Sequence, residues 1–495
     1  MRCRIILCCF LVLFQGCTTF KLIPEPSFSS EEGICLKWLE SIEAKLEEYE
    51  ISDPGTVKIA GFPQLRVNRF LASFSSEVKS DHAYAAWLEQ MRIIDAKNKV
   101  HMLDNLPKSE RMQLLTKIST GGNFDQAIAN CGKRLNDYTF NHTANKKIIL
   151  EHAKVPDSYQ DWKRVIGGYP IARYLATFAI NRLHRELNAS FKVSINELPV
   201  IGQLIRYSPP SNKPLLPDHI SSILNSAYDS GNPLGIPILS DLERQELFQH
   251  FAPVWEIDTR NDNDKVGMIN FDKNSHPSVD ISQPTVYTAL GYARWHGKVL
   301  LQLIYQIWLP AREKTGFFDL YGGPLDSVIW RITLTPEGTP MAFDSIHACG
   351  CYYLLFPGQG YRTIPPTDDA EPVLSPKHIT ENRPGSRLLL RLESRTHYLQ
   401  QVSSVNETLG NSSLFYQYQN LEELRSLSLP TGAMLSVYDE DGLIDASARA
   451  ERFLLWPFGI ISPGAMREWG THAISFIGKR HFDDPFLLEQ LLDKE

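Results

Sequence analysis

The strongest constraint on the fold of this chain is a strand pattern in its second half. Residues 299–309 are apolar except at Gln302 and Gln306, as expected of a strand whose two faces are both covered. Residues 328–334 alternate apolar and polar side chains, which is typical of a half-buried strand. Gln302 and Gln306 share one face of their strand, where they either line a polar pocket or form hydrogen bonds within the sheet.

The segments that follow extend this sheet. Residues 335–338, Thr-Pro-Glu-Gly, predict a turn before a strand that begins at Met341. Two more strands are expected at residues 387–392 and 434–438. We therefore expect residues 251–495 to form a mainly antiparallel, β-rich domain with a sandwich-like architecture.

The first part of the chain carries helical periodicity instead. Ser29 and Glu32 have the spacing of a capping box, and the apolar residues after them recur at helical intervals. Further helices are expected from Asp81 and over residues 125–138 and 170–187. The last of these has an apolar face through Ile171, Tyr174, Phe178 and Leu183. The chain is therefore expected to be an α+β protein with a helical N-terminal region.

The boundary between the two regions is expected where Pro, Gly and Asn accumulate. Residues 205–240 are rich in these turn-forming residues, and a short helix near Asp241 follows. Such a stretch is typical of an irregular connection. The predicted division is a helical region at 31–190, a connection with a short helix at 191–250, and the β-rich domain at 251–495.

The N-terminus has the layout of a secretory signal. Arg2 and Arg4 precede an uninterrupted apolar run at residues 5–14, and Gly16 places a small residue before Cys17. Charge, apolar core and a small residue at the cleavage point define such signals. The run is too short to span a bilayer, which needs about 20 apolar residues. The protein is therefore expected to be exported.

Residues 13–17, Leu-Phe-Gln-Gly-Cys, resemble the cleavage region of bacterial lipoproteins with a type II signal peptide. The resemblance implies that residues 1–16 are removed as a signal peptide, that Cys17 receives lipid, and that residues 17–30 form a tether. Thr18, in place of Asp, implies the outer rather than the inner membrane. Several acyl chains on one residue hold a protein firmly on a bilayer. The alternative is an ordinary signal peptide cleaved near Gly16, which would release the protein.

Composition limits the partners of the chain. Its 495 residues carry a net charge of −7, and loss of Arg2 and Arg4 with the signal makes the remainder more acidic. An acidic chain is not expected to bind nucleic acid, which selects basic surfaces. The expected partners are the membrane, through the acyl chains on Cys17, and a protein or cell-wall component of the envelope. The expected location is the cell envelope, with the protein facing the periplasm or the exterior.

Four cysteines remain beyond Cys17. Cys35 and Cys131 both fall on apolar helix faces, and Cys349 and Cys351 are separated by one glycine. In an oxidising compartment thiols tend to pair. The expected alternatives are a Cys35–Cys131 disulfide, a strained Cys349–Cys351 disulfide, or buried free thiols at either place.

The segment around Cys349 carries the reactive side chains. In an extended strand His347, Cys349, Cys351 and Tyr353 would share one face. His347 with the two thiolates, and His397 as a fourth ligand, would suit zinc or copper. The same residues would alternatively serve a cysteine hydrolase, with Asp344 orienting the base, or a thiol-redox protein.

The sequence therefore predicts a membrane-anchored envelope lipoprotein with a binding or structural role. The alternative is an envelope enzyme centred on His347, Cys349 and Cys351, either a metal-dependent or cysteine hydrolase or a thiol-redox protein. The Asn- and Asp-rich run at residues 261–264 lacks the ligand spacing of an EF-hand and is expected to be a solvated loop.

Overall fold

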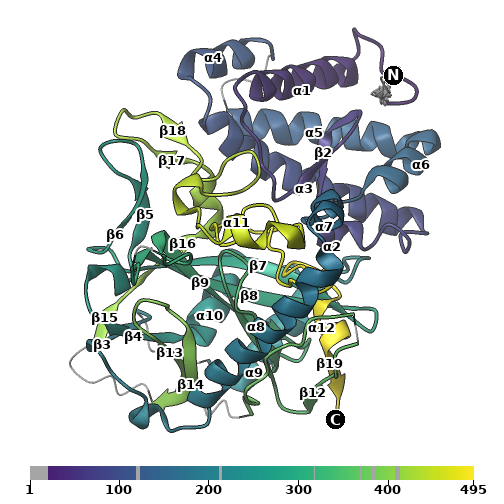
Figure 1. The fold of residues 1–495 in the computed structure, drawn as a ribbon. Helices are drawn as coiled ribbons and strands as arrows, with labels where there is room; N and C mark the ends of the chain where they lie inside the picture. Colours follow the sequence, from purple (N-terminus) through teal and green to yellow (C-terminus); the bar gives the residue numbers. More distant parts are fainter. Residues whose placement is uncertain are drawn as a thin grey trace, which may run out of the picture.

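A computed structural model describes residues 21–118, 123–210, 215–316, 318–367, 369–380, 386–406 and 413–495. The predicted signal peptide and the predicted lipid site, Cys17, lie outside these ranges. Helices dominate the N-terminal part and strands the C-terminal part (Figure 1). The predicted α+β class is therefore confirmed.

The N-terminal part packs long helices around a small hairpin. Helices α1 (Glu31–Glu48), α3 (Asp81–Asp104) and α5 (Phe124–Asn141) contact the hairpin formed by β1 (Val57–Ile59) and β2 (Phe62–Val67). The N-cap of α1 is Ser30, whose side chain accepts a hydrogen bond from the Gly33 backbone, so the predicted Ser29 capping box is wrong by one residue. Ser80 caps α3 in the same way, because its hydroxyl accepts from the Ala83 N–H. Such caps satisfy backbone donors that the first turn of a helix leaves free.

The other helices connect this part to the sheets or lie on their surface. They are α2 (Arg69–Ala72), α4 (Lys108–Thr116), α6 (Thr143–His152), α7 (Asp161–Ile166), α8 (Tyr169–Ser190), α9 (Pro217–Tyr228), α10 (Asp241–Phe251), α11 (Arg452–Leu455) and α12 (Leu487–Leu491). Short 3-10 turns occur at η1 (Ile195–Glu197), η2 (Asp262–Asp264), η3 (Leu421–Arg425), η4 (Asp445–Ser447) and η5 (Trp456–Phe458).

The main sheet has six strands, and five of them form an antiparallel meander. Its order is β11-β10-β9-β8-β7-β16, with β16 parallel to β7 at one edge. The strands are β7 (Thr285–Trp295), β8 (Lys298–Arg312), β9 (Gly323–Leu334), β10 (Pro340–His347), β11 (Leu354–Pro357) and β16 (Gln417–Asn420). The apolar run at residues 299–309 lies in β8, which is buried along that whole stretch.

A second sheet of five strands has the order β14-β13-β4-β3-β15. Its strands are β3 (Gln203–Ser208), β4 (Val254–Thr259), β13 (Ser386–Leu392), β14 (Leu399–Asn406) and β15 (Ser413–Phe415). Strand β3 pairs with β4, so the predicted connection at residues 191–250 contains a sheet strand as well as α9 and α10. The two-stranded pairs are β5 (Met268–Phe271) with β6 (Pro277–Asp280), β12 (Tyr361–Thr363) with β19 (Leu492–Lys494), and β17 (Leu427–Ser428) with β18 (Met434–Leu435).

Both faces of the main sheet are covered, which explains why β8 is apolar on both sides. Leu303, Tyr305 and Trp330 belong to a core that also contains Trp255 and Leu390 of the second sheet. The opposite face carries Ile304 and Trp308, which pack with residues of the C-terminal segment after β18. The two sheets therefore form a sandwich, and the C-terminal segment covers part of its outer face.

Candidate functional site

The predicted reactive segment is a turn rather than an extended strand. Strand β10 ends at His347, and the backbone then reverses, with the N–H of Gly350 donating to the His347 carbonyl at 2.8 Å. Gly350 and Tyr352 both have positive φ angles, of 87° and 61°. The prediction that His347, Cys349, Cys351 and Tyr353 share one strand face is therefore wrong, because Gly350 permits a left-handed turn between them.

Cys349 and Cys351 are free thiols in this turn, so the predicted strained disulfide between them is not present. Cys349 is buried and Cys351 is half-buried. A hydrogen bond with Cys349 and burial together raise the pKa of Cys351 well above its usual value. Cys351 is therefore protonated at neutral pH and is a poor nucleophile and metal ligand in this state. The other pair, Cys35 and Cys131, forms a disulfide between α1 and α5.

The structure does bring the two predicted histidines together, through an aspartate. His397 Nδ1 lies 2.7 Å from Asp326 Oδ2, and His347 Nδ1 lies 3.4 Å from the other oxygen of the same carboxylate. Asp264 approaches the far side of His397, with Oδ1 3.2 Å from Nε2. All four side chains are buried. They form the His–Asp cluster, which joins β9, β10, η2 and the turn between β13 and β14.

The protonation states of this cluster follow from burial and charge. Burial lowers the pKa of His347, whereas for His397 the hydrogen bonds to Asp264 and Asp326 outweigh burial and raise the pKa. Although burial opposes ionisation, both histidines hold the pKa of Asp326 well below its usual value. These directions favour the proton on His397, which lies between two carboxylates, over a proton on His347. Pairing and hydrogen bonds offset part of the desolvation penalty that these buried charges carry.

This cluster leaves no room for a substrate. The cavity beside His347 measures about 10 Å³, which is about the space of one water molecule. The rings of Tyr352 and Tyr398 pack against His347, and their hydroxyls accept hydrogen bonds from Arg312. Among the residues that the structure describes, no group of three or more His, Cys, Asp and Glu side chains is arranged to hold a metal ion. The geometry assigns the cluster a role in fastening the turns at this end of the sandwich.

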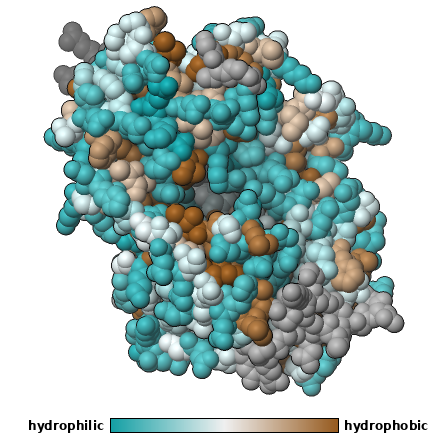
Figure 2. All heavy atoms as spheres, turned by 180° about the vertical axis from the view of Figure 1, so that it is seen from behind, coloured by the Kyte–Doolittle hydropathy of each residue, from teal (hydrophilic) through white to brown (hydrophobic). Residues whose placement is uncertain are grey.

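A large cleft lies elsewhere, where the N-terminal helices meet the main sheet. Its volume is 640 Å³, within the range of about 300–1,000 Å³ that is usual for ligand sites. The walls come from α2, α3, α10, β7, β16, η3 and the C-terminal segment. Seen from behind, the molecule has a hollow near its middle, with apolar side chains gathered beside it (Figure 2). The cleft occupies the part of the outer sheet face that the C-terminal segment leaves open.

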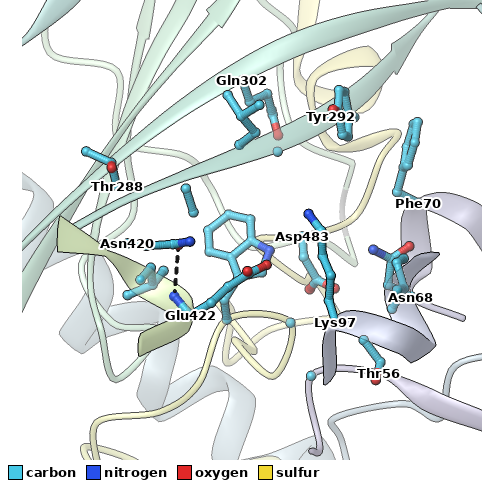
Figure 3. Close-up of a pocket in the computed structure, with 18 of the residues that line it drawn as sticks. Thr56, Asn68, Phe70, Lys97, Thr288, Tyr292, Gln302, Asn420, Glu422 and Asp483 are labelled. Atoms are coloured by element: carbon cyan, nitrogen blue, oxygen red, sulfur yellow. Dashed lines mark hydrogen bonds between the residues drawn. The ribbon is translucent and has the colours of Figure 1, made fainter. Parts of the chain in front are cut away.

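The sheet wall of the cleft is built around Gly291. A Cβ atom at this position would lie 3.0 Å from Oε1 of Gln302 on the neighbouring strand, so glycine leaves that oxygen room to face the cleft. The Gln302 amide donates to Thr333 at 3.1 Å, which fixes its orientation. Gln302 and Tyr292 come from the sheet, and Asn68 and Lys97 lie across the space from them (Figure 3). Gln306, by contrast, donates to Ser327 within the sheet and does not line the cleft.

The cleft is rich in amides and aromatic rings. Its amide side chains are Asn68, Gln90, Asn98, Gln245, Gln249, Gln302, Gln419 and Asn420. Its aromatic side chains are Phe70, Phe248, Tyr292, Tyr418, Tyr438 and Trp469. Each amide offers both a donor and an acceptor, and the rings supply flat apolar surface.

Two buried carboxyl groups in the cleft wall, those of Asp483 and Glu468, have raised pKa values. Burial raises the pKa of Asp483 to about 6, against the opposing charge of Arg69, whose Nε lies 3.2 Å from Asp483 Oδ2. The other oxygen of Asp483 is buried without a hydrogen-bond partner. Burial also raises the pKa of Glu468 to about 8, although Arg425 contacts this carboxyl at 2.6 Å. Both groups therefore hold protons closer to neutral pH than ordinary carboxyls do.

Comparison with known proteins adds no assignment. No model of a protein family matches the chain, and no curated protein or solved structure shows significant similarity to it. Within the described ranges, none of the helices has both the length and the apolar character required to cross a membrane.

Proposed function

We propose that the protein is a lipoprotein of the bacterial envelope whose cleft binds a saccharide. The observation that carries this proposal is the lining of the 640 Å³ cleft, which combines eight amide side chains with six aromatic rings. Ligand sites usually join apolar walls to a few convergent polar groups. The number of amides here calls for a ligand that is itself rich in hydrogen-bonding groups.

The charges around the cleft favour an uncharged ligand. Four basic and five acidic side chains line it, so neither sign dominates. Arg69 pairs with Asp483, and Arg425 pairs with Glu468. A site for a polyanion would instead present unpaired Arg or Lys side chains. Hydroxyl groups, which both donate and accept, suit the balanced lining better.

Saccharides can interact with both the amides and the aromatic rings of this lining. Their hydroxyls pair with planar amides, and the C–H faces of the sugar ring pack on aromatic side chains. Trp469 is the largest such ring in the cleft and is half-buried. It contacts Phe482 in a T-shaped arrangement with ring centroids 5.6 Å apart, which helps to hold the indole in place. A rigid aromatic platform costs little entropy when a ligand binds.

Calorimetry with soluble oligosaccharides tests the proposal. The probes are N-acetylglucosamine oligomers, glucose oligomers and soluble peptidoglycan fragments. At least one class is expected to bind, and Trp469→Ala is expected to weaken it at least tenfold, about 1.4 kcal/mol. Trp162→Ala is the matched control, because Trp162 is exposed and lies outside the cleft. The proposal fails if no probe binds, or if the two variants weaken binding equally.

Lipid attachment is tested separately. Cells supplied with a labelled fatty acid are expected to label the wild-type chain but not Cys17→Ser. Label that persists in the variant would refute the anchor and leave the binding proposal intact, since Cys17 lies outside the residues that form the cleft.

Hydrolysis of the bound saccharide is a second candidate, and Asp483 is the observation that favours it. Its carboxyl has a pKa raised to about 6 and an unpartnered buried oxygen in the cleft wall. A carboxyl that stays protonated near neutral pH can donate a proton to a glycosidic oxygen. Product release by the wild type that Asp483→Asn abolishes, with binding retained, would establish this activity. Binding without product would exclude it for the saccharide tested.

A further inference from the structure

The surface of helices α7, α8 and α11 carries large apolar side chains that face outward. On α7, Trp162, Val165 and Ile166 are 59%, 80% and 71% exposed. On α8, Ile171, Tyr174, Leu175 and Phe178 are each more than 70% exposed. Phe453 and Leu454 of α11 are 72% and 60% exposed. These nine side chains are called the apolar patch below, and a patch of this size is unusual on a soluble monomer.

The three helices form one continuous surface. All of them contact η5, and α7 also contacts α8. In Figure 1, α8 crosses the front of the molecule, and α7 and α11 lie near its upper end. The apolar patch therefore joins side chains from two segments about 290 residues apart in the chain.

Specific contacts hold this surface in place. The Arg164 guanidinium donates to the carbonyls of Phe458 and Gly478, at 2.8 and 2.7 Å. The Tyr169 hydroxyl accepts from the Gly478 N–H at 2.8 Å. At Gly167, a Cβ atom would lie only 2.6 Å from Pro457. Because the inner side of α7 and α8 is packed so closely, the outer side presents the apolar patch as a fixed feature.

Basic side chains accompany the exposed rings. Lys163 lies 5.6 Å from the centroid of Trp162, Arg173 lies 5.7 Å from that of Tyr174, and Arg452 lies 4.9 Å from that of Phe453. Residues 161–190 contain five Lys and Arg but two Asp and Glu, in a chain whose net charge is −7. Of these five, Arg164 is turned inward and Arg173 also pairs with Asp369 at 3.0 Å, which leaves Lys163, Arg182 and Arg185 beside Arg452 of α11. A local positive charge on an acidic protein is complementary to an anionic surface.

We propose that the apolar patch docks on the surface of an anionic lipid bilayer. Helices that lie in the membrane interface combine an apolar face bearing Trp, Phe and Leu with Lys and Arg beside it, and aromatic rings favour the level of the headgroups. The patch has this composition on all three of its helices. Docking goes beyond saccharide binding and does not require lipid on Cys17, because the patch itself supplies the apolar area and the charge.

Docking would also fix the orientation of the protein. The described chain begins beside α5 and α6, where Ile23 donates to Asn145 at 2.8 Å and Pro24 accepts from Tyr138 at 2.9 Å. Helix α7 is the next helix after α6, and both lie to the right of α11 in Figure 1. An anchor at the N-terminus and the patch would then give two attachments to one membrane.

Vesicle co-sedimentation tests the proposal without the anchor. The chain from Thr18 onward keeps every contact described here and lacks acyl chains. It is expected to bind vesicles of equimolar phosphatidylcholine and phosphatidylglycerol at least tenfold more tightly than vesicles of phosphatidylcholine alone. Added salt is expected to weaken this binding, because salt screens the charge contribution.

A double variant identifies the surface. Tyr174→Glu with Phe178→Glu is expected to lower binding to the anionic vesicles at least tenfold. Met112→Glu with Ile201→Glu is the matched control, since these residues are similarly exposed but lie outside the patch. Circular dichroism and the melting temperature of both variants are expected to match the wild type, because each substituted side chain is exposed.

Two results would overturn the proposal. One is wild-type protein that does not bind anionic vesicles, or that binds them equally after the Tyr174 and Phe178 substitutions. The other is a wild-type dimer that the same substitutions convert to a monomer, which would make the patch an interface between copies of this chain. Neither result bears on saccharide binding, because the patch and the cleft share no residue.

Discussion

Removing the disulfide between Cys35 and Cys131 measures how the helical region is held together. The bond joins α1 to α5 across 96 residues. In the chain-entropy model, closing a loop of this length lowers the entropy of the unfolded chain enough to stabilise the fold by about 4.7 kcal/mol at 25 °C. Both cysteines are buried, so alanine is a better replacement than serine, whose hydroxyl would need a partner. We expect Cys35→Ala with Cys131→Ala to lower the free energy of unfolding by about 3–5 kcal/mol.

Urea denaturation followed by circular dichroism measures this loss. Wild-type protein kept in reducing agent is the matched control, because it loses the same crosslink without a substitution. Thiol titration of the unfolded, unreduced chain from Thr18 is expected to find two reactive thiols, those of Cys349 and Cys351. A loss below about 1 kcal/mol, or four reactive thiols, would refute the reasoning.

Two further perturbations test the C-terminal segment. Burial lowers the pKa of His472 to about 3, so the stability tied to its neutral form is complete above pH 6.5 and is lost as the pH falls toward 3. His472→Leu is therefore expected to flatten the decline in urea midpoint between pH 6 and pH 4, and an unchanged decline would contradict this assignment. Gly350 has a φ of 87°, and a Cβ atom there would lie 2.3 Å from the Ala473 carbonyl oxygen. Gly350→Ala is expected to cost about 2–4 kcal/mol in urea denaturation, whereas Gly360→Ala, whose Cβ would meet no atom within 4 Å, is expected to cost less.

The regular elements could be predicted because their signals are local. The unbroken apolar run of β8 follows from the cover on both of its faces. The alternation of β9 correctly predicted a strand but not its burial, because Arg331 and Thr333 are also buried, paired with Asp344 and Gln302. Strand β18 ends at Leu435, short of the predicted residue 438, because the Val437 N–H donates to Leu424 of η3 instead. A local sequence pattern does not indicate tertiary contacts of this kind.

Helix α8 shows a different limit. Its periodicity correctly predicted a helix, but the apolar face through Ile171, Tyr174 and Phe178 is turned to solvent. A hydrophobic period shows that side chains share a face, not which surface that face meets. The outward direction depends on Arg164 and Gly167, which bind the opposite side of these helices to η5.

The candidate sites were predictable only in part. His347 and His397 were identified from their chemistry, but Asp326, which joins them, carried no signal of its own. Asp264 belongs to the run that was predicted to be a solvated loop, and that prediction is wrong for this residue, which is 1% exposed because it pairs with His397. Of the residues that line the cleft, the sequence pattern indicates only Gln302 as a possible pocket residue. The cleft walls come from segments spread between residues 55 and 483, which no local pattern connects.

Arg425 offers a direct test of how the cleft keeps its shape. Its guanidinium lies 3.5 Å from Asp53, contacts Glu468 at 2.6 Å, and donates to Asn98 of α3 at 2.8 Å. It therefore ties the N-terminal part to the C-terminal segment across the cleft. Without its charge, Asp53 and Glu468 would face each other, and the pKa of Glu468, already raised to about 8 by burial, would rise further because a like charge opposes ionisation.

Arg425→Met is therefore expected to loosen the cleft without unfolding either part. A second tie remains, since Arg294 of β7 contacts Glu77 at 2.6 Å. The expected result is a saccharide affinity at least tenfold lower and an increased radius of gyration in X-ray scattering. Arg244→Met is the control, because Arg244 lines the same cleft but pairs with Asp241 on its own helix. If the two variants bind saccharide equally well, the cleft does not depend on this contact, and its shape must come from the other contacts between the two parts, such as that of Arg294 with Glu77.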